Sequence, residues 1–388
     1  MSKKRPISLA LCVFLLLFSG CQKRTPAPEK TSPSGNAAWF NFRGNAALTG
    51  LAAEEPSADP ELLWSFPTEG YVISSPVIGF GHVYVGSTDG KVYALDLRTG
   101  DKVWAFDTGD DIEAPPLLDG DSLYIGNLSG DFFALDAETG RLRWTYSCDN
   151  SIFGSANAVP APDGDGRLLL IGSHDNRLHC LRDRDGSLVW AYETDNFING
   201  TPATDGRVAI FGGCDENLHI VSVSDGSKVG EVWAGSYIAG SAAIDQEVAY
   251  LGHYGNKLVA IDLKKKEIIW EYMDRKEGDA FFSSPAVGKD RILIGSRDSR
   301  LHCVDRMSGE GIWTFRTRDW VESSPVLAGD KVIFGSTDGR LYMVDSTDGK
   351  LLWSFEIGAA LIASPAVTGG LIAVGAEDGR IYLFGDKT

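Results

Sequence analysis

A unit of about 40 residues repeats along most of this 388-residue chain, and it limits the possible folds more than any other feature. Its clearest marker is a tryptophan, and successive copies lie 37 to 46 residues apart. The marker positions are Trp64, Trp104, Trp144, Trp190, Trp233, Trp270, Trp313 and Trp353. A repeat of this length is typical of solenoids, propellers and arrays, in which each copy is one supersecondary motif.

Each unit contains four short segments with strand character. In the first unit these are residues 75–78, 82–85, 92–95 and 103–106. Asp89-Gly90 and Thr99-Gly100 separate the later segments, and short alternating runs joined by such turns predict an antiparallel meander. One four-stranded sheet cannot bury both of its faces alone. Repetition of four strands every 40 residues therefore predicts a β-propeller.

The two ends of the repeat region indicate the number of blades. Eight first strands follow eight tryptophan strands, but the last unit, residues 360–386, ends without a tryptophan strand. Residues 61–66 form a tryptophan strand that no unit precedes. We therefore predict an all-β, eight-bladed propeller of four-stranded antiparallel blades over residues 61–388. The N-terminal strand completes the last blade.

The first sixty residues divide into three segments. Residues 1–20 carry a basic start, an apolar run and small residues before Cys21, which is the pattern of a signal peptide. The segment from Phe18 to Cys21 resembles a bacterial lipobox, which predicts lipidation of Cys21; a secreted protein with a chance cysteine is the alternative. Residues 21–37 are rich in Pro, Ser and charge and predict a flexible tether. The aromatic residues of segment 38–60 predict an extension that packs on the propeller.

The repeats resemble the PQQ-like (pyrroloquinoline quinone) β-propeller repeat family. The shared motif, A-x-D-x-x-T-G-x-x-x-W, is clearest at residues 94–104 and 134–144. The resemblance implies that the eight marker tryptophans each dock between neighbouring blades. Three departures from the motif are Arg182 in place of the aspartate, three extra residues before Trp233, and Lys266 in place of the glycine.

The signal, lipobox, tether and eight repeats together resemble the BamB-type lipoproteins of the outer-membrane β-barrel assembly machinery. That resemblance implies a non-enzymatic, monomeric scaffold that binds protein partners, the β-barrel insertase among them. It also implies a lipid anchor at Cys21 in the outer membrane, facing the periplasm. A generic secreted propeller that binds a small ligand remains an alternative, as does a quinoprotein dehydrogenase that uses pyrroloquinoline quinone. The dehydrogenases carry an adjacent cysteine pair, which this sequence lacks.

Charge and composition argue against several other functions. The formal net charge is −17, which disfavours nucleic acid as the main partner. We find no catalytic constellation, no cofactor motif and no metal site in the sequence. His174, His179 and Cys180 are spaced like zinc ligands, but His179 and Cys180 are successive strand residues and point to opposite faces. We therefore interpret His179, and its repeat equivalents His219 and His302, as packing residues.

The cysteines give one open question. Cys180 and Cys303 occupy the same repeat position three blades apart, so they cannot form a disulfide and are expected to be buried. Cys148 and Cys214 are expected on the same face of the ring, and their pairing stays open.

The first strands of a propeller line its axis, so the residues that precede them border the mouth of the channel. Aligning the units places aromatic and acidic residues there, which favours a protein-binding surface, although they could instead simply fill the channel. The candidate partner-binding residues are Tyr71, Asp111, Glu113, Phe197, Tyr237, Trp320 and Glu322.

Overall fold

The computed structural model describes residue 2 and residues 38–274 and 279–387. The predicted signal peptide (apart from residue 2), Cys21 and the predicted tether lie outside the described residues. No helix in the described part of the chain is long and apolar enough to cross a membrane.

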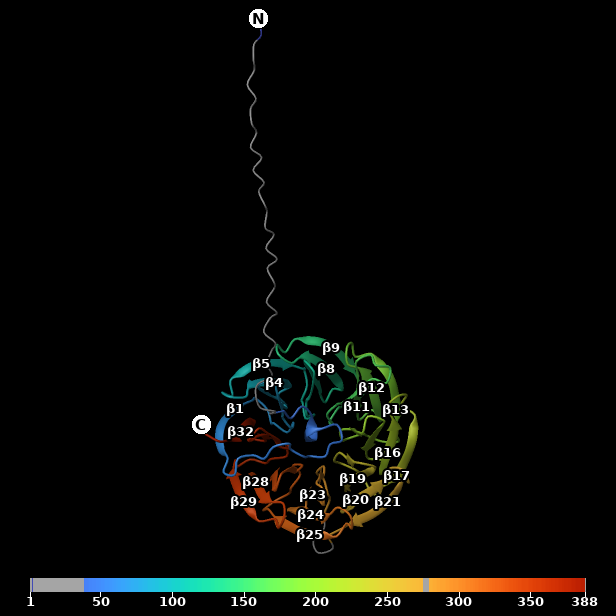
Figure 1. The fold of residues 1–388 in the computed structure, drawn as a ribbon, viewed down its shortest axis with the longest axis vertical. Coiled ribbons are helices and arrows are strands. Elements are labelled where there is room, and N and C mark those ends of the chain that lie inside the picture. The colour runs from blue at the N-terminus through green and yellow to red at the C-terminus, as the bar shows by residue number, and fades with distance from the viewer. Residues whose placement is uncertain (1, 3–37, 275–278, 388) are drawn as a thin grey trace. The chain divides into compact units, whose positions relative to one another are not determined.

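Eight four-stranded antiparallel sheets follow one another around a ring, which confirms the predicted eight-bladed all-β propeller (Figure 1). Blades one to three contain β2 (Val77–Gly79), β3 (His82–Gly86), β4 (Lys91–Asp96), β5 (Lys102–Asp107); β6 (Leu117–Asp119), β7 (Ser122–Gly126), β8 (Asp131–Asp136), β9 (Leu142–Ser147); and β10 (Asn157–Pro160), β11 (Arg167–Gly172), β12 (Arg177–Arg182), β13 (Leu188–Glu193). Blades four to six contain β14 (Ala203–Thr204), β15 (Val208–Gly212), β16 (Asn217–Ser222), β17 (Lys228–Trp233); β18 (Ala243–Asp245), β19 (Val248–His253), β20 (Lys257–Asp262), β21 (Glu267–Tyr272); and β22 (Ala286–Val287), β23 (Arg291–Ser296), β24 (Arg300–Asp305), β25 (Gly311–Arg316). Blade seven contains β26 (Val326–Ala328), β27 (Lys331–Gly335), β28 (Arg340–Asp345) and β29 (Leu351–Glu356).

The last blade joins the two ends of the ring. It consists of β30 (Ala366–Thr368), β31 (Leu371–Ala376), β32 (Arg380–Gly385) and β1 (Glu61–Pro67). β1 pairs antiparallel with β32, from Glu61 opposite Gly385 to Pro67 opposite Arg380 (Figure 1). The predicted closure by the N-terminal strand is therefore confirmed.

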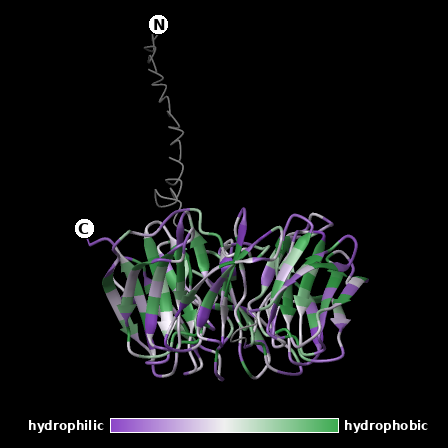
Figure 2. Cartoon of the chain, turned by 90° about the horizontal axis from the view of Figure 1, so that it is seen from below, coloured by the Kyte–Doolittle hydropathy of each residue, from purple (hydrophilic) through white to green (hydrophobic). Residues whose placement is uncertain are grey.

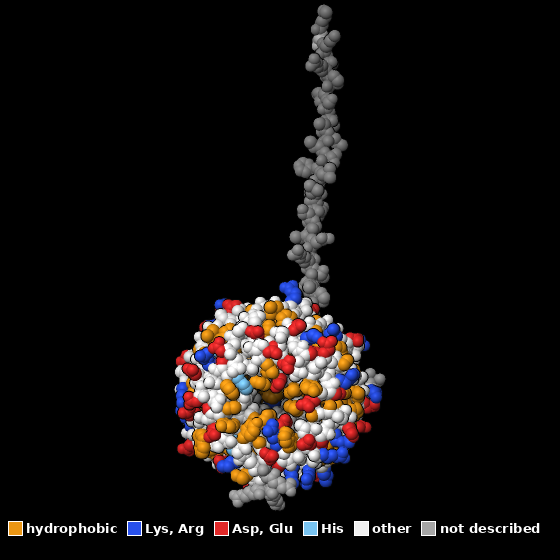
Figure 3. All heavy atoms as spheres, turned by 180° about the vertical axis from the view of Figure 1, so that it is seen from behind, with side chains coloured by type: hydrophobic (Ala, Val, Ile, Leu, Met, Phe, Trp, Pro, Cys, Tyr) orange, Lys and Arg blue, Asp and Glu red, His pale blue; other side chains and the backbone are white. Residues whose placement is uncertain are grey.

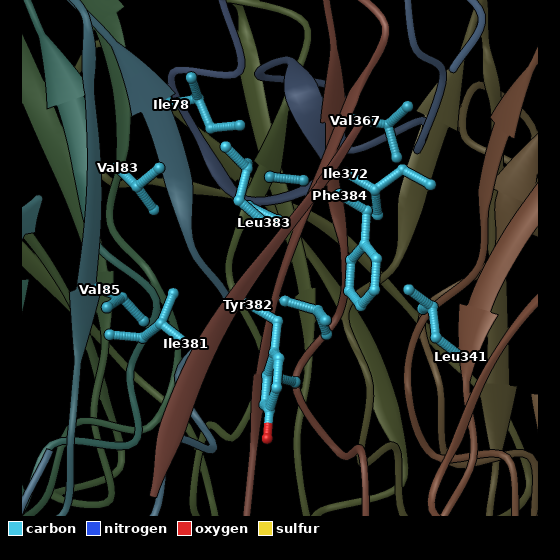
Figure 4. Packing of buried hydrophobic residues seen from close by; sticks show 14 of the residues in the cluster. Ile78, Val83, Val85, Leu341, Val367, Ile372, Ile381, Tyr382, Leu383 and Phe384 are labelled. Carbon is cyan, nitrogen blue, oxygen red and sulfur yellow. The ribbon is translucent and has the colours of Figure 1, made fainter. Parts of the chain in front are cut away.

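Apolar side chains fill the spaces between neighbouring blades. The second and third strands of each blade are buried on both faces, because a sheet packs against each side of them. Figure 2 shows this pattern as hydrophobic strands between hydrophilic loops. The packing continues across the closure: Ile381 and Leu383 of β32 belong to one cluster with Val83 of blade one and Leu341 of blade seven (Figure 4).

Indoles connect successive blades through hydrogen bonds. In six cases the marker tryptophan donates its Nε1–H to a backbone carbonyl of the next blade, at 2.9 to 3.1 Å. The six are Trp64, Trp104, Trp144, Trp190, Trp270 and Trp313. Each lies against a glycine of the next blade's turn, as Trp64 does against Gly100, where a Cβ would approach the ring to 2.6 Å. Trp353 packs instead on the closure blade, where its ring lies 5.7 Å from that of Phe384.

The interpretation of Trp233 as a docking residue was wrong. Trp233 is 65% exposed, because Gly230 takes the position opposite Ile220 that other blades give to tryptophan. Lys266 of blade five fills the vacated space: its side-chain carbons lie 2.7 Å from where a Gly230 Cβ would stand. Its ammonium donates to the Val229 carbonyl at 2.6 Å. The lysine thus replaces both the apolar contact and the hydrogen bond that the indole makes elsewhere.

The three histidines of the third strands are buried. His179, His219 and His302 are at most 4% exposed. They replace Tyr93, Tyr342 and Tyr382, whose hydroxyls donate to an aspartate four residues earlier, as Tyr93 does to Asp89 at 2.6 Å. Each histidine keeps this bond through Nε2.

Residues 38–57 run along the ends of the inner strands and contact every blade. Their backbone bonds to blades one, two, four, five, six, seven and eight in turn, through Ile78, Leu118, Thr204, Ile244, Val287, Leu327 and Gly370. The Asn157 amide of blade three donates to the Ala46 carbonyl. We call this segment the strap, and Figure 1 shows it crossing the centre of the ring.

Arg43 of the strap is buried near the axis. It lies in the 3₁₀ turn η1 (Phe42–Gly44) and is 1% exposed. One guanidinium nitrogen donates to the carbonyls of Pro285 and Pro325, at 3.1 and 2.6 Å. Burial lowers the pKa of Arg43 to about 9. The strap therefore closes one end of the axial channel and joins blades six and seven there.

Candidate protein-binding face and axial cup

The end of the channel opposite the strap forms an open cup of about 490 Å³. In every blade one residue of the segment that precedes the first strand lines it: Ile73, Glu113, Phe153, Asn199, Ala239, Phe282, Glu322 and Ile362. Phe42 of the strap also lines the cup. Figure 3 shows hydrophobic side chains gathered around this central hollow.

The seven candidate partner-binding residues divide between the cup and its rim. Glu113, Glu322 and Tyr237 line the cup, and Tyr237 remains 49% exposed. The others stand exposed outside the cup lining: Tyr71, Asp111, Phe197 and Trp320. The structure thus places them around one opening, in blades one, two, four, five and seven.

A second column of side chains stands beside the rim, and the sequence analysis missed it. In every blade a residue of the turn that follows the second strand donates its N–H to a backbone carbonyl at the rim, at 2.9 to 3.0 Å. This column contributes His174, Tyr254 and Arg297. His174 stacks on Phe197 at 4.6 Å and lies 4.4 Å from Phe153. The repeated turn position was the signal that could have identified the column.

Arg297 lies at the centre of an aromatic group at the mouth. Its guanidinium lies 4.3 Å from the ring of Phe282 and 4.8 Å from that of Trp320. Its Nε also donates to Glu322 at 2.6 Å. Cation–π contacts and a salt bridge hold the guanidinium among the rings, so these side chains form a prearranged amphipathic surface.

A circle of hydroxyl groups lies deeper in the cup. The backbone N–H of one inner strand donates to the hydroxyl of the next blade's equivalent residue in six successive steps, at 2.8 to 3.0 Å. The accepting residues are Thr201, Ser241, Ser284, Ser324, Ser364 and Ser75. Pro115 interrupts the circle because it has no hydroxyl. These bonds fix the inner strands at equal spacing and give the cup a rigid, polar base.

The electrostatics of the cup are acidic. Glu113 and Glu322 line it, and among the described residues no lysine or arginine does. Burial, and then the nearby charge of Asp111, raises the pKa of Glu113. Pyrroloquinoline quinone carries three carboxylates, and the arginine beside the cup, Arg297, is already paired with Glu322, so among the described residues the lining offers these carboxylates no free cation. The residues present do not fit that cofactor.

The cysteines of the described residues are all free thiols, so Cys148 and Cys214 do not pair. Cys180 and Cys303 are fully buried, as predicted. Cys214 lines the cup, where the Asn199 amide lies 3.2 Å from its sulfur.

The ring of four-stranded blades with interblade tryptophans defines a PQQ-like repeat propeller. A family model confirms this class along the chain, with matches to residues 55–158, 89–232, 156–280 and 267–387. The model is described as outer membrane protein assembly factor BamB, and the chain belongs to this family. No curated protein sequence matches the chain.

Solved structures of this fold include proteins with different functions. BamB from Moraxella catarrhalis has a TM-score of 0.71 and 19% identity, covering 84% of this chain and 100% of its own. A europium-containing methanol dehydrogenase scores 0.74 at 14% identity, covering 90% and 98%. The quinohemoprotein alcohol dehydrogenase from Comamonas testosteroni scores 0.75 at 14% identity, covering 91% and 81%. Similarities at these identities establish the fold alone.

Proposed function

We propose that this protein is a non-enzymatic scaffold of the cell envelope that binds protein partners through the mouth of its axial cup. The observation that carries the proposal is the set of exposed aromatic residues around one opening, with Arg297 held among three rings. Tyrosine, tryptophan and arginine are the residues that most often dominate the energy of protein interfaces. The family match supports a role in outer-membrane protein assembly. The β-barrel insertase is the partner that we propose for that role.

The proposal includes attachment to the membrane through a lipid on Cys21, with the folded ring as a monomer in the periplasm. The lipobox-like sequence before Cys21 supports this anchor. A Cys21→Ser protein should leave the membrane fraction after a salt wash without detergent. Retention of that variant with the membranes would show that another feature holds the protein there.

The mouth is tested by removing two of its aromatic residues together. Trp320→Ala with Tyr237→Ala should weaken co-purification of the β-barrel insertase by about tenfold or more, since interface hot spots each contribute about 2 kcal/mol. The melting temperature should change little, because these side chains are 43% and 49% exposed. Phe80→Ala is the matched control: Phe80 is 53% exposed and stacks on Phe40 of the strap, at the opposite end of the channel.

Two results would count against this function. Loss of stability with unchanged capture would mean that the aromatic residues fill the channel and do not bind a partner. Stoichiometric binding of pyrroloquinoline quinone in the presence of Ca²⁺ would instead support the dehydrogenase alternative, contrary to the acidic lining of the cup.

A further inference from the structure

A thiol, a carboxylate and an imidazole meet at the boundary between blades two and three. Cys148 follows β9 of blade two, whereas Asp175 and His179 belong to blade three. One ligand atom from each lies within 4.8 Å of the others. All three side chains are at most 8% exposed. The thiol that approaches His179 is thus Cys148, and not the neighbouring Cys180, which faces the other side of the sheet.

We propose that Cys148, Asp175 and His179 form a zinc site that joins blades two and three. Thiolate, imidazole and carboxylate are the ligands that Zn²⁺ takes in proteins, at about 2.0 to 2.3 Å from the metal. Three protein ligands leave one tetrahedral position for water. Cys148 is followed directly by the exposed Asp149 and Asn150, so the cluster lies just beneath the surface.

The surroundings of His179 already orient it for a metal. Its Nε2 lies 2.9 Å from the Asp175 carboxylate, and its Nδ1 lies 3.0 Å from the Tyr146 hydroxyl. A hydroxyl can donate or accept, so Tyr146 can accept an N–H from Nδ1 when Nε2 gives its lone pair to zinc. A metal-bound histidine generally has such a partner on its other nitrogen, which fixes the ring and its tautomer.

Two other blades carry the same aspartate–histidine pair, and they show what is particular to Cys148. His219 bonds to Asp215 in blade four, but the position of Cys148 there is taken by Thr194, which bonds to backbone carbonyls. His302 bonds to Asp298 in blade six, where that position is Asp274. Arg300 already forms an ion pair with Asp274, at 3.6 Å. In blade three the corresponding Arg177 pairs with Asp149 instead.

Zinc binding by the purified, chelator-treated protein tests the proposal. The wild-type protein should bind one Zn²⁺ and melt at a higher temperature with it, and Mg²⁺ and Ca²⁺ should have no such effect. Co²⁺ in place of zinc should show the charge-transfer absorption of a thiolate ligand. Cys148→Thr introduces the residue that stands at the equivalent positions 68, 108, 194 and 317, so the metal-free fold should be retained.

Cys148→Thr should weaken zinc binding by about 100-fold or more, since loss of even an outer partner can cost that much. Cys214→Ser is the control, and it should leave zinc affinity unchanged. Failure of the wild-type protein to bind zinc would overturn the proposal, as would equal affinity in Cys148→Thr. If the threonine variant does not fold, absence of the thiolate–cobalt band in the wild-type protein would also overturn it.

Discussion

His253 is a buried side chain whose protonation the fold opposes. It is 2% exposed, and its Nδ1 accepts the backbone N–H of Gly255 at 2.9 Å. Burial, and then the positive charge of Lys257, lowers the pKa of His253 to about 4. A proton on Nδ1 would also place two donors against each other. The folded protein therefore holds this imidazole neutral.

Acid should destabilise the protein through His253. The unfolded chain binds the proton near pH 6.5, above the folded value, so stability is complete above pH 6.5 and falls as the pH drops toward 4. The loss from this residue should be about 2 kcal/mol between pH 7.5 and pH 5. His253→Ser, which introduces the residue that other blades carry as Ser87 and Ser173, should remove that part of the loss.

Urea unfolding of the wild-type and His253→Ser proteins at the two pH values measures the difference. An identical loss of stability in both proteins would show that other groups cause the acid sensitivity.

For single residues, the sequence predicted the layer in which a side chain lies better than it predicted which side chains it contacts. Repeat alignment placed Glu113, Phe282 and Glu322 in one layer, and all three line the cup. Arg297 was missed because its role depends on stacking between Phe282 and Trp320, and no spacing in the sequence records that contact. Trp233 was placed wrongly because the alignment counted the residue type and not its register in the strand.

Among the elements, β17 and the turn before β21 depart from the repeat together. Gly230 stands where a tryptophan is expected, and Lys266 stands where a glycine is expected. The Lys266 backbone has φ +61°, so even here the turn keeps the left-handed conformation that favours glycine. The two departures therefore compensate each other: the large side chain at the interface of blades four and five comes from blade five, and not from blade four as at the other interfaces.

Restoring the usual pair should reveal this coupling. Gly230→Trp alone should clash with Lys266, and Lys266→Gly alone should leave a cavity, so each should destabilise the protein. The double variant should recover part of that loss, with a coupling energy of about 0.5–3 kcal/mol. Unfolding free energies of the four proteins in a double-mutant cycle measure the coupling; additive effects would contradict the exchange.

Strands and turns were predictable because their signals are local. Alternation and the Asp-Gly and Thr-Gly turns of each unit correspond to the hairpins in the structure. The link between Gly230 and Lys266 was not predictable, because residues 36 positions apart in the sequence meet only after blades four and five pack. The sequence analysis therefore gives Lys266 and the three extra residues before Trp233 as separate departures from the motif.

For the whole molecule, closure depends on β1 as much as on any strand within the repeats. Trp64 and Trp104 are both 9% exposed and both donate to the next blade, at 3.0 and 3.1 Å. Trp64→Ala and Trp104→Ala should therefore each cost about 3–5 kcal/mol of unfolding free energy. Trp233→Ala should change stability by about 0.5 kcal/mol or less, because its side chain is mostly in solvent.

Thermal or urea unfolding of the three variants checks this order. A Trp64→Ala protein as stable as the Trp233→Ala protein would mean that β1 contributes little to the ring. Trp39, which also lies outside the repeats, cannot replace Trp233 as the exposed-tryptophan control, because its side chain in the strap is only 3% exposed.

The number of blades could be counted from the sequence, since the last unit lacks a fourth strand and a tryptophan strand stands alone before the first unit, which together require closure. The path of the strap could not be predicted. Residues 38–57 lack the repeat's periodicity. They are held by hydrogen bonds to backbone groups, such as those of Leu118 and Val287, and backbone groups are the same in every sequence.

The strap and β1 also determine when the molecule can become complete during its synthesis. These segments leave the ribosome before the blades, yet Ser57 bonds to Gly370 and β1 pairs with β32, which are made after the other seven blades. Until residue 385 is available, the growing chain keeps two unpaired strand edges, which are sites of aggregation and proteolysis. A prematurely terminated chain never loses those edges. Only a chain that includes β32 can therefore close the ring and be protected from aggregation and proteolysis at these edges.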